Sequence, residues 1–304
     1  MPESSPPPIA ISIVIPAFNE EGGILPTLQR LLAVDFAGSG VGLVEIIVVD
    51  DGSQDRTAEL VGTVDGVTLL HHAKNRGYGA SLKTGIRYAA HDLVCITDAD
   101  GTYPNERIPE LAARLIHDRC DMVVGARTGE NVSIPPLRRP AKWAINQLAN
   151  LVAGQPIPDL NSGLRVFRRG AALRFFNILP DGFSFTTTIT LAMLTNGYLV
   201  EYIPIDYHAR IGQSKIRPIR DTLNFTQLVG RIALYFAPLK VFMPLSLLLV
   251  LLGVGWGVLS TLVLGRLADL STLVMVMTGI QVGVVGLLAE LVNRRLPNFY
   301  RDDD

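Results

Sequence analysis

The sequence predicts an α/β domain with a largely parallel but mixed sheet, followed by an amphipathic helix and a pair of transmembrane helices. Three observations lead to this prediction. Short apolar runs alternate with helical patterns from residue 9 to about residue 124. A helical apolar stripe then occupies the region 218–240, and two long uncharged runs follow it.

Five short apolar runs in the first part of the chain predict β-strands, because they are rich in β-branched residues and end at turn signals. They read IAISIVIP, VEIIVVD, VTLLHH, LVCITDAD and MVVGA. Amphipathic patterns between them predict helices near residues 21–33, 56–63, 78–90 and 105–117. Pro104 suits the start of the last helix, where its missing N–H group has no cost.

The pattern changes after residue 124. Residues 125–160 are basic and rich in proline, which predicts a loop over an active site followed by a helix. Two later runs, SGLRVFRR and YLVEYIPIDYHAR, predict strands on either side of a helix near residues 184–196. We therefore expect a mixed sheet in a domain that spans residues 9–217.

The ends and the composition of the chain give further expectations. Residues 1–8 (MPESSPPP) are rich in proline and serine, so they should form a disordered tail. They contain no basic region followed by an apolar stretch, so they do not resemble a signal peptide. The formal net charge of −1 and the lack of a basic domain argue against a nucleic-acid partner. Cys95 and Cys120 are too few for a disulfide framework or a cysteine metal site, and Cys95 should lie in the core.

The hydrophobic excess of the chain is concentrated near its C-terminus. Hydrophobic residues make up 48% and charged residues 18% of the sequence, and the mean hydropathy is +0.32. Residues 241–264 and 270–289 carry no charge. Each run is long enough to cross a hydrocarbon core of roughly 30 Å, which takes about 20 apolar residues. Two buried helices of a soluble core are the less favoured alternative, because uncharged runs of this length are rare there.

Charge predicts the orientation of this membrane segment, 241–293. The connector, residues 265–269, is so short that both ends of the helix pair must lie on one side. Positive residues gather at those ends, whereas the connector has only Arg266. They are Arg217, Arg220, Arg231, Lys240, Arg294, Arg295 and Arg301. We therefore expect an integral protein of the cytoplasmic (inner or plasma) membrane, with the α/β domain and the tail 294–304 in the cytoplasm.

The segment before the first span leaves two alternatives open. Its apolar residues recur at helical spacing. They are Ile219, Leu223, Phe225, Leu228, Val229, Ile232 and Phe236. This stripe could pack against the α/β domain, or it could lie in the membrane interface beside the span.

Acidic or polar clusters follow three of the predicted strands. Asp98-Ala99-Asp100 comes directly after LVCIT, Asp50-Asp51-Gly52-Ser53 ends the second strand, and Pro16-Ala17-Phe18-Asn19-Glu20 ends the first. Each cluster alone is better explained by a turn and a helix cap, as for Asp55. Together they predict a nucleotide site at the carboxyl edge of the sheet. Two carboxylates and a diphosphate form the oxygen shell that Mg²⁺ or Mn²⁺ prefers.

Two other motifs are weaker. The segment 75–80 (NRGYGA) opens a predicted helix, so its glycines should allow close backbone approach and its helix start should face an anion. It has neither the lysine spacing of a P-loop nor the full dinucleotide fingerprint. The sequence therefore predicts neither an ATPase nor a dehydrogenase from this segment. His71 and His72 are adjacent in a strand and point to opposite faces, so we do not expect them to bind a metal together.

Taken in order, the motifs resemble those of a known family. VIPAFNE, DDGSQDRT, NRGYGASLKTGI, TDADGTYP, VVGAR, DLNSGLRVF and YHARIGQSK are similar to the family 2 glycosyltransferases, in particular the polyprenyl-phosphate hexosyltransferases. The resemblance implies a GT-A fold, a Rossmann-like mixed sheet. It also implies metal-dependent, inverting transfer of a hexose from a nucleotide-diphosphate sugar, with a UDP-sugar favoured over GDP-mannose, to a polyprenyl phosphate.

The same resemblance implies roles for single residues. Glu20 and Asp51 would hold the nucleoside, and Asp98 and Asp100 would contact the donor and the metal. The whole donor set is Pro16, Ala17, Glu20, Asp51, Gly77, Asp98, Ala99 and Asp100. The acceptor phosphate would meet Arg127, Arg138, Arg139, Arg210 and Lys215. The catalytic set would be Asp98, Asp100, Arg210 and Lys215. Thr102 departs from the glutamine that some mannose synthases have near the metal, which weakens a mannose assignment.

Elementary chemistry agrees with this reaction. A phosphate monoester is largely dianionic at pH 7, so it needs positive charge to hold it and no strong general base. Two other functions remain as alternatives: a sugar-phosphate nucleotidyltransferase, whose glycine-rich opening with an arginine is absent here, and a non-catalytic membrane scaffold. The expected partners are a nucleotide sugar, a polyprenyl phosphate and the lipid bilayer, and a homo-oligomer is left open.

Overall fold

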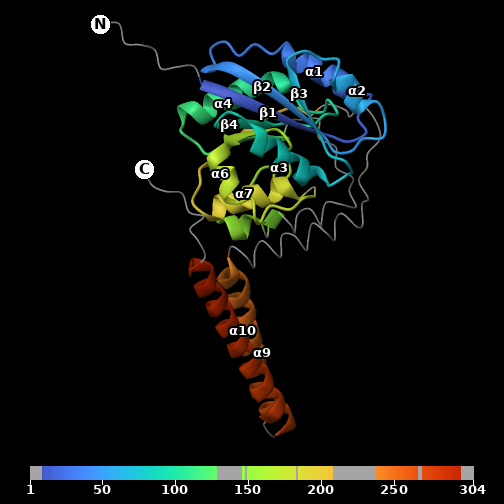
Figure 1. Cartoon of the computed structure of the whole chain (residues 1–304). Coiled ribbons are helices and arrows are strands. Elements are labelled where there is room, and N and C mark those ends of the chain that lie inside the picture. The colour runs from blue at the N-terminus through green and yellow to red at the C-terminus, as the bar shows by residue number, and fades with distance from the viewer. Residues whose placement is uncertain are drawn as a thin grey trace, which may run out of the picture. The chain divides into compact units, whose positions relative to one another are not determined.

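The structure is a computed structural model that describes residues 9–128, 146–147, 149–182, 184–207, 237–265 and 269–295 (Figure 1). The chain divides into two compact units, one of which carries the sheet and the other the two long C-terminal helices. The expected tail of residues 1–8, the amphipathic helix up to residue 236 and the tail from residue 296 lie outside the described residues. The predicted domain boundary at residue 217 also falls there.

The first unit contains a seven-stranded mixed sheet with the strand order β3-β2-β1-β4-β6-β5-β7. The strands are β1 (Ile9–Ala17), β2 (Val41–Asp50), β3 (Val67–His71), β4 (Leu93–Ile96), β5 (Met122–Ala126), β6 (Arg165–Arg168) and β7 (Val200–Pro204). Strand β6 runs antiparallel to both of its neighbours, and all other pairs are parallel. The predicted strands and the mixed sheet are therefore confirmed.

Helices connect these strands, and all of them except α6 lie near the predicted places. They are α1 (Ile24–Leu32), α2 (Thr57–Val61), α3 (Tyr78–Tyr88), the short 3₁₀ helix η1 (Asn105–Arg107), α4 (Ile108–His117), α6 (Arg169–Arg174) and α7 (Phe185–Thr195). Helix α6 is the element that the sequence did not predict. The strand SGLRVFRR ends at Arg168, and the chain turns directly into the helix. A helix of six residues is too short to show its period in the sequence.

Side chains alternate across the sheet, and helices cover both faces. Ile11, Ile13 and Ile15 of β1 are 0% exposed and share one core cluster with residues of α1, α2 and α4. Val14 points to the other face, where Gly85 of α3 packs against it. Figure 1 shows α3, α6 and α7 together on the opposite side of the sheet from α1 and α2. Burial from both sides explains why these strands are almost uninterrupted apolar runs.

The second unit contains two long apolar helices, α9 (Pro238–Leu264) and α10 (Asp269–Arg295). Ser246 Oγ donates to the carbonyl oxygen of Gly279 at 2.6 Å, and Trp256 Nε1 donates to Ser271 Oγ at 2.9 Å. These contacts run in opposite directions along the two sequences, so the helices form an antiparallel hairpin. Residues 238–263 and 270–292 are long and apolar enough to cross a membrane.

The exposure of this hairpin fits lipid better than a soluble core. Large apolar side chains on both helices are exposed, among them Leu251, Leu262 and Leu270. Soluble proteins rarely leave apolar patches of this kind open to water. The hairpin thus presents its apolar side chains outward, as membrane-spanning helices do.

A lysine fixes a further segment of the second unit. Lys240 Nζ donates to the carbonyl oxygens of Leu151, at 3.3 Å, and Val152, at 2.9 Å. Val152 also packs against Ala237 and Val241. The cation therefore caps the C-terminal end of the helical residues 149–153, where carbonyl groups lack partners within the helix.

Candidate active site

The sheet topology brings the predicted clusters to one edge. All strands except β6 run in the same direction, so their carboxyl ends and the start of β6 share that edge. Strand β1 lies between β2 and β4 in the sheet. The chain leaves β1 on one side and returns to β4 on the other, which makes the gap between them a topological switch point. Open α/β sheets bind ligands at such points.

Backbone contacts join the loops that follow β1 and β2. The N–H group of Asn19 donates to Ser53 Oγ at 2.9 Å, and that of Gln54 donates to Asn19 Oδ1 at 2.7 Å. The N–H group of Glu20 donates to Thr57 Oγ1 at 2.8 Å. Asn19 has a φ of +50°, in the left-handed region that asparagine tolerates. The predicted donor residues Pro16 and Ala17 thus form the end of β1, and Glu20 lies in the loop that these hydrogen bonds join to the loop after β2.

Asp51 has a structural role that the sequence does not reveal. Its carboxylate is buried and accepts the N–H groups of Arg76, at 2.9 Å, and Gly77, at 2.8 Å. His72 Nδ1 lies 2.7 Å from the same carboxylate, and His71 Nδ1 lies 2.6 Å from Asp50. The two histidines thus pair with neighbouring acids at the end of β2. Asp51 and Gly77 hold each other, and their contact with a nucleotide stays a prediction.

The glycine-rich start of α3 accommodates another part of the chain. Gly77 has a φ of +103°, and a Cβ atom there would lie 2.5 Å from the carbonyl oxygen of Asp181. That oxygen accepts the N–H group of Ala80 at 3.0 Å, and Lys83 Nζ pairs with the Asp181 carboxylate at 2.8 Å. A close approach does occur here, but it is between two parts of the protein backbone, and the approach of an anion stays a prediction. The backbone that approaches is that of residues 180–182. The N–H groups of Gly77 and Ala80 already donate to protein oxygens, so fewer N–H groups at the start of α3 remain for the predicted anion.

The loop that follows β4 carries the two aspartates. Asp100 is 6% exposed, and its Oδ1 atom accepts the N–H group of Thr102, at 3.1 Å, and the Thr102 hydroxyl, at 2.6 Å. The carbonyl oxygen of Ala99 accepts the hydroxyl of Thr27 in α1 at 3.1 Å. Tyr78 at the start of α3 donates its hydroxyl to Asp98 Oδ1 at 3.0 Å. Loss of solvation at this hydroxyl and the charge of Asp98 raise the pKa of Tyr78 well above its usual range.

This donor set fits a hard divalent cation. Asp98 and Asp100 offer carboxylate oxygens from one short loop, and Mg²⁺ and Mn²⁺ prefer such ligands. Within the described part of the chain, no group of three or more His, Cys, Asp or Glu side chains could hold a metal ion.

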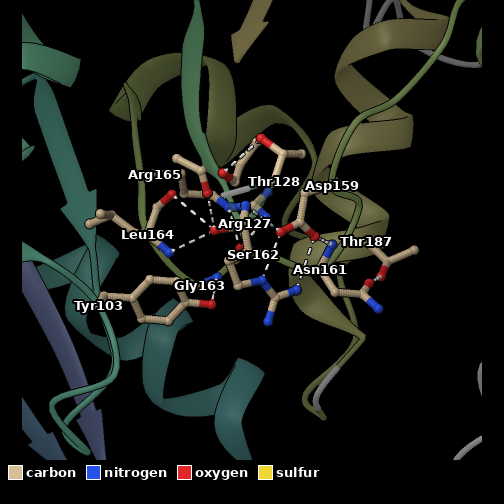
Figure 2. A network of polar contacts seen from close by, with 12 residues as sticks. Tyr103, Arg127, Thr128, Asp159, Asn161, Ser162, Gly163, Leu164, Arg165 and Thr187 are labelled. Atoms are coloured by element: carbon tan, nitrogen blue, oxygen red, sulfur yellow. Dashed lines mark hydrogen bonds and ion pairs between the residues drawn. The ribbon is translucent and has the colours of Figure 1, made fainter. Parts of the chain in front are cut away.

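Arg127 lies at the same edge but has a counter-ion (Figure 2). Its Nε and Nη2 atoms donate to the two oxygens of Asp159 at 2.7 Å and 2.9 Å, and its guanidinium lies 5.3 Å from the ring centre of Tyr207. Burial alone would lower the pKa of Arg127, but the hydrogen bonds to Asp159 raise it. Burial alone would raise the pKa of Asp159, but Arg127 lowers it. The predicted phosphate contact of Arg127 would thus be made by an arginine that is already paired.

The loop before β6 forms a buried network that the sequence interpretation did not single out. Arg165 is 0% exposed, and its guanidinium donates to the carbonyl oxygen of Ser162, to that of Thr186 at 3.0 Å, and to Thr190 Oγ1 at 2.8 Å. Burial lowers the pKa of Arg165. Figure 2 shows the N–H group of Gly163 directed at the Tyr103 hydroxyl, 2.6 Å away. The available signal was a charged residue inside the apolar run LRVF.

The structure does not test four of the predicted acceptor residues. Arg138, Arg139, Arg210 and Lys215 lie outside the described residues, so their roles stay predictions. The structure brings together Asp98, Ala99, Asp100, Glu20 and Arg127 at one edge of the sheet.

Comparison with known proteins adds independent observations. Residues 12–176 match the profile of glycosyl transferase family 2, and residues 237–294 match that of the GtrB C-terminal hairpin. A dolichyl-phosphate hexose transferase of Haloferax volcanii is 30% identical over 68% of this chain and 87% of its own length. A dodecaprenyl-phosphate galacturonate synthase of Rhizobium johnstonii is 27% identical over 97% of this chain and 90% of its own.

One solved structure has a fold similar to that of this chain. The glucosyl-3-phosphoglycerate synthase of Mycobacterium tuberculosis, crystallised with Mn²⁺, UDP and phosphoglyceric acid, has a TM-score of 0.58 at 19% identity. The match covers 74% of this chain and 78% of that one. At this identity the likeness concerns the fold alone, which is the GT-A-like arrangement expected from the sequence.

Proposed function

Because this chain belongs to glycosyl transferase family 2, we propose that it transfers a hexose from a nucleotide-diphosphate sugar to a polyprenyl phosphate at the membrane. The observation that carries the proposal is the Asp98-Ala99-Asp100 loop at the switch point of the sheet, in the same chain as an apolar hairpin. Relatives named for transfer to dolichyl and dodecaprenyl phosphates support the choice of acceptor.

The donor would bind across the gap between β1 and β4. In this proposal, Pro16, Ala17 and Glu20 contact the nucleoside, together with Asp51 and Gly77. Asp98 and Asp100 contact the ribose and the diphosphate of the donor. A UDP-sugar is the favoured donor, and the presence of Mn²⁺ and UDP in the crystals of the M. tuberculosis enzyme agrees with this choice. A divalent cation held by Asp98 and Asp100 would neutralise the charge that develops on the leaving diphosphate.

The acceptor brings its own nucleophile. An oxygen of the polyprenyl phosphate forms a bond to the anomeric carbon, the bond from that carbon to the diphosphate breaks, and the nucleoside diphosphate leaves with the electron pair. A single displacement of this kind inverts the anomeric centre. Arg127, with Arg138 or Arg139, and Arg210 and Lys215 would hold the acceptor phosphate against the negative donor. No protein base is needed, because the phosphate is already ionised at pH 7.

The hairpin would bring this reaction to a membrane. We propose that α9 and α10 span the cytoplasmic membrane and that the sheet domain faces the cytoplasm, since positive residues gather before the first span and after the second, whereas the connector has only Arg266. A membrane anchor would keep the site near an acceptor whose chain is confined to the bilayer.

The test is a matrix of donors and acceptors. Purified protein in neutral detergent is incubated with UDP- and GDP-sugars and with polyprenyl phosphates of several lengths, and products are identified by mass spectrometry. The proposal requires a polyprenyl-phosphate sugar and a released nucleoside diphosphate. A separate incubation with a nucleoside triphosphate and a sugar 1-phosphate tests the alternative, because formation of a nucleotide sugar with release of pyrophosphate there would support a nucleotidyltransferase. No product in any combination would support a scaffold.

A further inference from the structure

The space around residue 163 allows only glycine there. Its backbone is not in the left-handed region, so an alanine there would not be strained by conformation. A Cβ atom at this position would instead lie 2.9 Å from both carboxylate oxygens of Asp98. Real Cβ atoms almost never come this close to another heavy atom. The carboxylate of Asp98 therefore occupies the room that the missing side chain leaves.

The backbone at Gly163 is held in place, so it cannot retreat. Its N–H group donates to the Tyr103 hydroxyl at 2.6 Å. The carbonyl oxygen of Ser162 accepts two donors of the buried Arg165, and the Ser162 hydroxyl donates to the carbonyl oxygen of Gly125 at 2.5 Å. The added Cβ atom would also lie 3.0 Å from Cε2 of the buried Tyr103. An added methyl group would thus displace the end of the Asp98 side chain, which can rotate, and would press on the Tyr103 ring as well.

Tyr78 limits the same carboxylate from another side. Its hydroxyl donates to Asp98 Oδ1 at 3.0 Å. Tyr78 belongs to α3, whereas Gly163 precedes β6, so two elements far apart in the sequence define the orientation of one side chain. Neither residue is in the predicted donor or acceptor set.

We propose that Gly163 and Tyr78 are positioning residues that set the direction of the Asp98 carboxylate, and that they thereby control the affinity for a nucleoside diphosphate with its divalent cation. The inference rests on the proposed function, because it assumes that Asp98 contacts the donor. Neither residue touches the reacting atoms; each acts through Asp98.

The test compares Gly163→Ala and Tyr78→Phe with wild type, using full-length protein in neutral detergent. Calorimetry measures the Kd of UDP and of GDP with Mn²⁺, and thermal unfolding measures Tm. Since a well-placed contact to a charged group corresponds to about a tenfold change in affinity or more, we expect Gly163→Ala to weaken Mn²⁺-dependent nucleotide binding at least about tenfold. Its Tm should fall by no more than about 5 °C, because the strain falls on the Asp98 side-chain end and, to a smaller extent, on the Tyr103 ring. Tyr78→Phe should weaken the same binding about three- to tenfold.

Gly170→Ala is the matched control. Gly170 is also outside the left-handed region, and a Cβ atom there would meet nothing within 4 Å. This variant should bind like wild type. In active protein, the Mn²⁺ concentration for half-maximal rate should rise for Gly163→Ala and Tyr78→Phe, and the KM of the lipid phosphate should not. A purely structural defect would not produce this split.

Any of three results would overturn the inference. Unchanged nucleotide binding in a stable Gly163→Ala protein would show that the direction of Asp98 does not matter. If Gly163→Ala fails to fold, Tyr78→Phe decides, since it removes one oxygen atom only, and unchanged binding there has the same meaning. Wild type that binds neither nucleotide with Mn²⁺ would instead contradict the proposed function, and the inference with it.

Discussion

Thr102 holds the carboxylate of Asp100 with two donors at once. Its N–H group and its hydroxyl both donate to Asp100 Oδ1, at 3.1 Å and 2.6 Å. Thr102 is 0% exposed, so this contact does not compete with water. The residue that departs from the mannose synthase pattern therefore orients one of the two aspartates proposed to bind the cation.

We expect Thr102→Val to weaken this orientation without loss of the fold. Valine keeps the shape and the N–H donor but removes the hydroxyl, whose bond to a charged acceptor is worth about 1.5 kcal/mol or more. The Mn²⁺ concentration for half-maximal activity should rise roughly tenfold. Thr102→Ser, which keeps the hydroxyl, should behave like wild type. Equal metal dependence in all three proteins would show that Thr102 does not orient a metal ligand.

The Arg127–Asp159 pair should make stability depend on pH in a defined range. Arg127 keeps the pKa of Asp159 below its ordinary value of 3.8. A lowered pKa means that the pair stabilises the fold fully above that value and that this contribution is lost as the pH falls below it. Asp159→Asn leaves a largely buried Arg127 unpaired, which costs about 3 kcal/mol at pH 7, or roughly 6 to 12 °C in Tm for a domain of this size.

Thermal unfolding of wild type and Asp159→Asn across pH checks this prediction. The difference in Tm should be constant between about pH 5 and 7 and should shrink as the pH falls below about 4, because the carboxyl of the unfolded chain is protonated there first and that of the folded protein only at lower pH. A difference that is as large well below pH 4 as at neutral pH would be inconsistent with an ion pair.

Arg210 is predicted from the sequence to meet the acceptor phosphate. Arg210→Ala should lower kcat/KM for the lipid phosphate by roughly ten- to a hundredfold, since charge-assisted phosphate contacts contribute about 1.5–3 kcal/mol each. Nucleotide affinity, followed by calorimetry, should not change. Arg220→Ala is the control, because a cation that only attracts anionic lipid has no role in neutral detergent. Loss of donor affinity in Arg210→Ala would indicate that Arg210 contacts the diphosphate of the donor and not the acceptor phosphate.

The orientation of the hairpin can be mapped with single cysteines. Cys95 and Cys120 are both buried free cysteines. Both are replaced first, so that only the introduced cysteine can be labelled. A cysteine placed at Arg266, in the connector outside the described residues, should react with an impermeant maleimide added to intact cells. One placed at Lys74, an exposed residue of the sheet domain, should react only after lysis. The reverse pattern would show that the domain lies outside the cytoplasm.

The parts of the site that follow from local pattern were predictable. Asp98 and Asp100 directly follow an apolar strand, and parallel strands deliver their carboxyl ends to one edge, so the shared edge could be inferred from the sequence. The hairpin was equally clear, because runs of about 20 uncharged apolar residues are rare outside membrane spans.

The parts that depend on distant contacts were not predictable. Asp51 accepts N–H groups that lie 25 and 26 residues further along the chain. Arg127 pairs with an aspartate 32 residues away. Nothing in the composition around Asp51 and Arg127 indicates such partners, so the sequence alone predicts only a ligand contact for each of them. Arg165 was overlooked for the same reason, since its acceptors are neutral oxygens from a loop and a helix.

The most direct test of the central claim is metal-dependent sugar transfer to a polyprenyl phosphate by wild type and by Asp100→Asn. Both proteins are purified in neutral detergent and shown to have the same Tm, and the product is measured by mass spectrometry with Mn²⁺ and with an excess of chelator. The proposed function predicts a polyprenyl-phosphate sugar from wild type with Mn²⁺, and at least about a hundredfold less with chelator or from Asp100→Asn. Undiminished transfer by Asp100→Asn at limiting Mn²⁺ would contradict it.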